Sequence, residues 1–74
     1  MNIKAVEVLD HYHLSIESDD GRTGIFDVTP YLQYEAFEAL RNLDEFRKIS
    51  NGHYYLEWAC GADLSADTIE AKLT

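Results

Sequence analysis

The sequence has few of the residues that link small proteins covalently or stiffen their loops. Its 74 residues include one cysteine, Cys60, and one proline, Pro30. A single cysteine excludes an internal disulfide and fits a reducing compartment. The first residues lack the basic segment and apolar run of a signal peptide, and no apolar run approaches the roughly 20 residues of a membrane helix. We therefore expect a cytoplasmic protein without a membrane partner.

Basic residues are also scarce. Six lysines and arginines stand against fourteen aspartates and glutamates, so the net charge is −8 at pH 7. Phosphate binding needs clustered Lys and Arg, and we therefore expect no direct contact with nucleic acid. The charge favours another small, more basic protein as partner. The simpler interpretation is an acidic domain whose charge only keeps it in solution.

The length allows a single domain, residues 1–74, with one core. A chain of this size buries only about 60% of the surface of its unfolded form. Such domains often depend on disulfides, a structural metal or a partner subunit for stability, so self-association is a second partner hypothesis. Five tyrosines, three phenylalanines and Trp58 supply the area for a tight aromatic core.

The first third of the sequence predicts a three-stranded meander. Apolar and polar residues alternate in the period of half-buried strands over residues 6–8, 12–17 and 23–28. Asp10 and His11 form the first tight connection, and the Asp20-Gly21 pair is a hairpin turn with positive φ. Gly24 in the third strand indicates a bulge or the close approach of another backbone.

The middle of the sequence predicts short helices. Thr29 is a helix N-cap followed by Pro30 at the first helical position. A second helix covers Glu35–Arg41. Asn42 and Glu45 have the spacing of a capping box, which opens a third short helix. That helix is expected to bury its two apolar residues, Leu43 and Phe46.

The last third predicts a strand, a loop and a helix. Residues 53–58 alternate, which places Tyr54, Leu56 and Trp58 on the inner face. A loop over residues 59–63 leads to a helix that begins after the N-cap Ser65. Leu64, just before the cap, and Ile69 have the spacing of a hydrophobic staple. Ile69 and Leu73, four residues apart, form one apolar stripe that faces inward. The predicted fold is α+β, in the order β-β-β-α-α-β-α, with a four-stranded mostly antiparallel sheet and helices packed on one face.

The outward face of the predicted last strand is the candidate partner-binding surface. It carries His53, Tyr55 and Glu57, and Asp63 follows in the adjoining loop. Tyrosine and histidine are common at interfaces, and a strand at a sheet edge can also pair with another chain. The alternative is a solvated face with one tyrosine lying flat on it.

No catalytic, metal or cofactor site is predicted. Cys60 precedes a helix, where a thiolate is stabilised, but no histidine has a spacing that brings it to Cys60 as a base. His11 and His13 do not converge, since His11 lies in a turn. Asp63 is interpreted as a loop residue that accepts hydrogen bonds from backbone N–H groups, and Gly61 as a position of positive φ. We therefore expect no enzyme.

The chain resembles the bacterial family called domain of unknown function 2442 over nearly its whole length. The residues that carry the resemblance are Val6 and Val8, residues 12–16, Asp20-Gly21, residues 26–30, Phe37, Leu40 and Phe46, and residues 58–64 with the pattern Trp58-x-x-Gly61-x-Asp63-Leu64. The resemblance implies a small α+β domain without an assigned activity. It also implies a gene neighbourhood like that of toxin–antitoxin pairs, because standalone members are often encoded beside another small domain of unknown function.

Together these observations predict a noncatalytic protein-interaction domain, the acidic and antitoxin-like member of a small two-protein module. The alternative is a domain that binds or senses a small molecule through the loop at residues 59–63, as part of a regulator.

Overall fold

The computed structural model describes residues 1–74 and confirms a small α+β domain. The elements in chain order are β1 (Ile3–Val8), β2 (His13–Ser18), β3 (Thr23–Asp27), the 3-10 helices η1 (Thr29–Tyr31) and η2 (Glu35–Arg41), α1 (Leu43–Phe46), β4 (Ile49–Asn51), β5 (Tyr55–Trp58), β6 (Asp63–Ser65) and α2 (Ala66–Lys72). None of these helices has the length and apolar character needed to cross a membrane.

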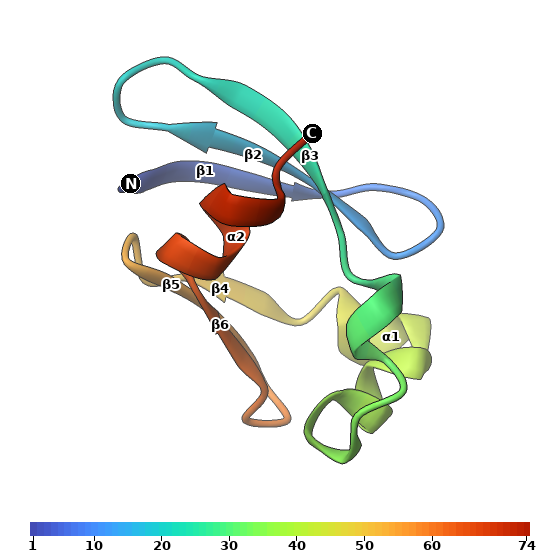
Figure 1. Ribbon diagram of the computed structural model, residues 1–74. Coiled ribbons are helices and arrows are strands. Elements are labelled where there is room, and N and C mark those ends of the chain that lie inside the picture. The colour runs from blue at the N-terminus through green and yellow to red at the C-terminus, as the bar shows by residue number, and fades with distance from the viewer.

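The strands form two three-stranded antiparallel sheets, in the orders β1-β2-β3 and β4-β5-β6. Figure 1 shows the two sheets facing one another at an angle, with the core between them. The predicted single four-stranded sheet is therefore wrong. The strands β4 and β6 have three residues each, which is too short for alternation to reveal them.

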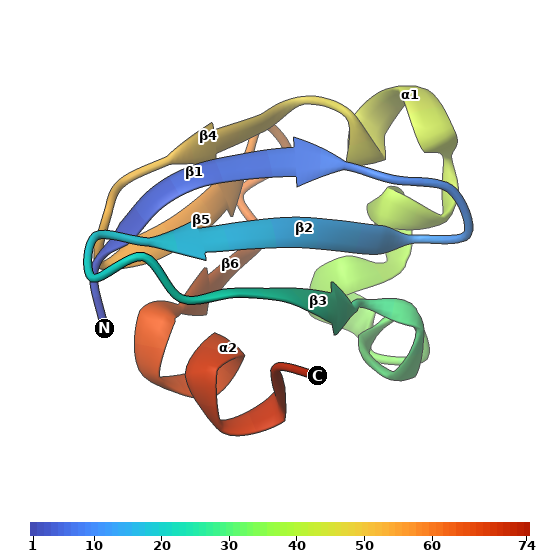
Figure 2. The same cartoon turned by 90° about the horizontal axis from the view of Figure 1, so that it is seen from above.

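The helical segments also differ from the prediction, because they do not cover one face of a sheet. η1, η2 and α1 follow one another at one end of the two sheets, whereas α2 lies at the opposite side and runs from β6 toward the outer edge of β3 (Figure 2). The strands β1 and β4 lie side by side where the two sheets meet. The arrangement resembles a half-open barrel with α2 across its opening.

The predicted meander is confirmed, with inward Leu14, Ile16 and Phe26 almost fully buried. The second hairpin turns at Gly21, whose φ is +88°. The first hairpin turns one residue later than predicted. Its positive φ angles lie at His11 (59°) and Tyr12 (63°), so the flanking residues of the turn are Asp10 and His13.

The C-terminal residues close the outer edge of β3. The Ile25 N–H donates to the Thr74 carbonyl oxygen at 2.8 Å, and the Thr74 N–H donates back to Ile25 at 3.0 Å. Gly24 leaves room for this contact, because a Cβ at Gly24 would lie 2.6 Å from the Leu73 Cγ. The predicted close approach at Gly24 is confirmed.

The caps of the helical segments are partly as predicted. Thr29 is not the N-cap of η1, since it lies inside that helix, and its N–H donates to the Asp27 side chain at 2.9 Å. Asn42 does cap α1, where it accepts from the Asp44 N–H at 2.9 Å. The reciprocal half of the predicted capping box is wrong, because the Glu45 carboxylate instead pairs with Lys48.

Aromatic side chains fill the end of the core near α1. Trp58 stacks on Phe46 with ring centroids 6.0 Å apart, and its Nε1 donates to the Phe46 carbonyl oxygen at 2.9 Å. Tyr12 meets the same Phe46 ring edge-on at 5.2 Å. Leu43, predicted to be buried with Phe46, is 47% exposed. α1 is a single turn, and Phe46 alone reaches Trp58 and Tyr12 from it.

The final helix is confirmed in detail. The Ser65 hydroxyl accepts from the Thr68 N–H at 3.2 Å, as expected of an N-cap. Leu64 and Ile69, the two residues of the predicted staple, are both buried. This local pattern needed no tertiary information, since each partner lies within five residues of the other.

Candidate functional site

The predicted partner-binding residues fall on three different elements. Tyr55 and Glu57 lie on β5, Asp63 lies on β6, and His53 lies in the turn between β4 and β5. β5 is the central strand of its sheet. It therefore has no free edge, so the condition under which this strand could pair with another chain, a position at the sheet edge, is not met.

His53 is not part of the outward strand face. Its φ is +70°, and its N–H donates to the Asn51 side chain at 2.8 Å. Its carbonyl oxygen accepts from the Ile3 N–H at 2.7 Å, and its Nδ1 lies 2.9 Å from the Ile3 carbonyl oxygen. His53 and Asn51, which also donates to Ile3, join the start of β1 to the second sheet.

Two tyrosines beside this turn are exposed. Tyr54, predicted to face inward, is 68% exposed because it precedes the start of β5 and does not follow the strand alternation. Tyr55 is 46% exposed. Its ring lies over Gly52, since a Cβ there would be 2.4 Å from the ring carbon Cζ. The two phenol rings thus present aromatic surface at one end of the sheet.

Glu57 and Asp63 face each other across β5 and β6 on the outer face of the sheet. The Trp58 N–H donates to Ala62, and the Ala66 N–H donates to Tyr54. Since bonded and non-bonded pairs alternate along an antiparallel ladder, Glu57 and Asp63 occupy a non-hydrogen-bonded pair, where opposed side chains lie closest. We call these two residues the acidic pair.

The acidic pair has no cation of its own. The ion pairs of the chain use other carboxylates, including Glu70, which binds the Arg22 guanidinium at 2.8 Å. Like charges directly opposite one another on two strands destabilise a sheet. Asp63 also makes no side-chain hydrogen bond to the backbone, so its predicted role as a loop acceptor is wrong: it is a strand residue exposed on the outer face.

The turn between β5 and β6 carries the predicted loop motif. Gly61 has a φ of +98°, as predicted, and Cys60 is an exposed free thiol. The chain has two hollows, and neither Cys60 nor any other residue of 59–63 lines them. His, Cys, Asp and Glu side chains nowhere gather in groups of three that would hold a metal ion.

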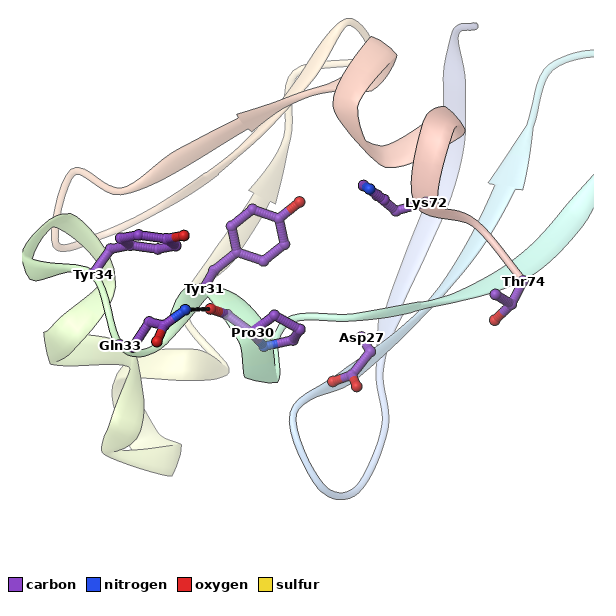
Figure 3. A pocket seen from close by; sticks show the side chains of 7 residues that line it. All are labelled: Asp27, Pro30, Tyr31, Gln33, Tyr34, Lys72 and Thr74. Atoms are coloured by element: carbon purple, nitrogen blue, oxygen red, sulfur yellow. Dashed lines mark hydrogen bonds between the residues drawn. The ribbon is translucent and has the colours of Figure 1, made fainter.

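The larger hollow has a volume of about 400 Å³ and lies between the end of β3, η1 and the end of α2. Figure 3 shows the side chains that line it: Asp27, Pro30, Tyr31, Gln33, Tyr34, Lys72 and Thr74. No pattern in the sequence predicted this site. The only sequence signal is the pair of tyrosines soon after Pro30, while Lys72 and Thr74 are about 40 residues away along the chain.

Asp27 is the carboxylate of this hollow. Partial burial tends to raise its pKa, but hydrogen bonds from Thr29 and the nearby His13 ring outweigh that effect and hold the pKa below its ordinary value. The His13 Nε2 lies 3.8 Å from the Asp27 Oδ1. Asp27 is therefore ionised at neutral pH and contributes a fixed negative charge.

A family model described as "Protein of unknown function (DUF2442)" matches residues 3–74 of the chain. The chain belongs to the DUF2442 family. No curated protein and no solved structure matches it. The family therefore supplies no activity from which to interpret the site.

The pattern Trp58-x-x-Gly61-x-Asp63-Leu64 has a clear structural meaning in this DUF2442 domain. Trp58 and Leu64 are core residues on neighbouring strands, and Gly61 supplies the positive φ of the turn between them. Asp63 is the one member that faces outward, next to Glu57. Three of the four residues thus shape the hairpin, and the fourth belongs to the acidic pair.

Proposed function

We propose that this DUF2442 domain is a noncatalytic protein-interaction domain, the acidic, antitoxin-like member of a two-protein module in the cytoplasm. Its partner is a more basic protein, which binds the outer face of β5 and β6. The observation that carries the proposal is the acidic pair, two opposed carboxylates without a cation, on the same strand face as the exposed ring of Tyr55. The cytoplasmic location rests on the free thiol of Cys60.

The geometry suits a lysine or arginine from the partner. Two unit charges about 4 Å apart repel by about 1 kcal/mol in water and by about 4 kcal/mol at the effective dielectric of a protein surface. A cation between Glu57 and Asp63 turns this repulsion into attraction. The tyrosine rings add rigid contact area at a low entropy cost. The charges therefore govern specificity and association rate, and the rings supply most of the affinity.

The same features argue against two copies of this chain meeting face to face. Each copy carries a net charge of −8, and such an interface would bring two acidic pairs together. Strand addition to β5 is also blocked, because β4 and β6 occupy both of its edges. A partner on the outer face of β5 must therefore bind through side chains and carry positive charge.

A pull-down from native cells with matched baits tests this proposal. The first bait is the wild-type domain, the second carries Glu57→Lys and Asp63→Lys, and the control carries Glu35→Lys and Glu38→Lys on η2. Both variants change the net charge equally. We expect the wild type and control to recover the same basic protein in amounts that fall with added salt, and the second bait to lose it.

Equal recovery by all three baits would place the interface elsewhere. Recovery of no partner by the wild-type bait would count against an interaction function as a whole. A small-molecule sensing role is the alternative function, and the hollow beside Tyr31 favours it. The loop at residues 59–63, where that role was first expected, borders neither hollow.

A further inference from the structure

The hollow between β3, η1 and α2 has the size and wall chemistry of a small-molecule site. Its volume of about 400 Å³ falls within the range of about 300–1,000 Å³ that is typical of ligand pockets. Pro30, Tyr31 and Tyr34 form apolar walls, while Asp27, Lys72 and other polar side chains line the remainder. It lies apart from the outer face of β5 and β6, so an inference from it is independent of the protein-binding proposal.

Two hydrogen-bond donors in this hollow lack partners within the chain. Lys72 takes part in none of the ion pairs, which hold Arg22, Arg47 and Lys48. The Tyr31 hydroxyl, unlike that of Tyr12, donates to no group of the chain. Figure 3 shows the Lys72 ammonium and the Tyr31 hydroxyl pointing toward one another. An ammonium and a phenol that converge in this way suit a carboxylate.

Asp27 supplies the opposite charge on another wall. It lines the hollow across from Lys72 (Figure 3), and its ion-pair partner is the His13 ring and not Lys72. A ligand with only a carboxylate would meet Asp27 and the field of a chain whose net charge is −8. A ligand with both an ammonium and a carboxylate has no net charge and satisfies both walls.

We propose that this hollow binds a free amino acid with an aromatic or large apolar side chain. The carboxylate of the ligand accepts from the Lys72 ammonium and the Tyr31 hydroxyl. The ammonium of the ligand donates to Asp27, and its side chain packs against Pro30 and Tyr34. The juxtaposition of β3, η1 and the last turn of α2 creates the site, which explains why no single stretch of sequence reveals it.

Titration with L-phenylalanine, followed by backbone amide chemical shifts, tests the proposal on the full chain. A ligand this small binds with a dissociation constant of about 0.1–1 mM, and the shifts should concentrate at the residues of the hollow. Two analogues remove one charge each: N-acetyl-L-phenylalanine lacks the ammonium, and L-phenylalanine amide lacks the carboxylate. We expect each analogue to bind at least about tenfold more weakly, because each loses a charge-assisted hydrogen bond.

Variants of the protein give the complementary measurement. Lys72→Met and Asp27→Asn should each weaken L-phenylalanine binding by about tenfold or more. Asparagine keeps an oxygen that accepts from the Thr29 N–H, so the local fold is preserved. Lys4→Met is the matched control, since Lys4 is an exposed lysine on β1 outside the hollow, and it should bind like the wild type.

Three results would overturn the proposal: no shifts at the hollow up to about ten times the expected dissociation constant, equal binding of either analogue, or unchanged binding by Lys72→Met. Equal binding of N-acetyl-L-phenylalanine would identify a simple carboxylate site instead. None of these results bears on the pull-down with the acidic-pair variants, so the two proposals fail or succeed separately.

Discussion

The substitution Gly24→Ala tests how the C-terminal residues are attached to β3. The added Cβ would lie 2.6 Å from the Leu73 Cγ, 2.9 Å from its Cδ2 and 3.0 Å from the Thr74 carbonyl oxygen. The φ of Gly24 is not in the left-handed region, so alanine is not strained by its own backbone. The whole cost therefore comes from the contact with the last two residues.

The size of the effect follows from these distances. The Leu73 side chain can rotate away, but the Thr74 oxygen is backbone, and it accepts from the Ile25 N–H at 2.8 Å. Overpacking of this kind costs about 1–3 kcal/mol. A chain of this length has a free energy of unfolding of about 4–11 kcal/mol, and each 1 kcal/mol lowers Tm by about 4–8 °C. The substitution should thus be readily measurable.

Urea unfolding followed by Trp58 fluorescence gives the free energy, since Trp58 is the only tryptophan and is buried. Hydrogen exchange at the Ile25 amide reports the local contact, and it should accelerate in Gly24→Ala. The control is the double variant with Leu73→Ala, which removes the two shortest contacts. The cost of Gly24→Ala should be smaller in that background, with a coupling energy of about 0.5–2 kcal/mol.

Strictly additive effects of Gly24→Ala and Leu73→Ala would refute this reasoning, because they would show that the two side chains do not meet. Unchanged exchange at the Ile25 amide would show that the C-terminal residues are not paired with β3. A destabilisation with the expected coupling but slow exchange at Ile25 would also contradict the mechanism, since the cost would then arise without release of the edge.

Two further predictions concern local interactions. The pKa of Asp20 lies below its ordinary value. Its carboxylate accepts hydrogen bonds from the Ser18 hydroxyl and the Arg22 backbone N–H, and the charge of Arg22 lowers the pKa further. Because the folded-state pKa is the lower one, Asp20 stabilises the fold above its unfolded pKa of about 3.9 and loses that contribution as the pH falls through the folded value. The free energy of unfolding, measured with urea, should therefore fall more steeply between pH 6 and pH 3 in the wild type than in Asp20→Asn. Parallel curves for the two proteins would contradict the assignment. Ser65→Ala removes the N-cap of α2 and should cost about 1 kcal/mol, whereas Ser50→Ala, at an exposed position on β4, should leave Tm unchanged; equal Tm values for the two variants would disprove the cap.

The parts of the fold that were predicted correctly depend on neighbours in sequence. The meander follows from alternation, which is clearest over residues 12–17, and from a turn in which Gly21 supplies the required positive φ. The final helix follows from Ser65 and its staple. In both cases the interacting groups are separated by few residues, so one local segment contains all the information.

The errors arise where a short segment depends on a distant one. β4 and β6 are strands only because β5 lies between them and exchanges backbone hydrogen bonds with both. His53 left the predicted outward face because its backbone and ring bind Ile3, fifty residues away. Tyr54, next to it, is exposed because it lies between this turn and the start of β5. Alternation cannot describe residues whose conformation is set by a turn that joins two sheets.

The candidate site was found in part. Glu57 and Asp63 were both singled out, yet their direct opposition depends on the register between β5 and β6. The hollow beside Tyr31 was not found, because its charged walls, Asp27 and Lys72, come from opposite halves of the chain.

The sequence alone determined the acidic charge, the meander, the caps at Asn42 and Ser65 and most of the core residues, because these depend on composition and on contacts within a few residues. Only the tertiary structure decided that there are two sheets, that Glu57 lies against Asp63, and that Lys72 and Asp27 border one hollow. Such pairings depend on which distant segments pack together, and that choice is made by the burial of the whole core and not by any one segment of it.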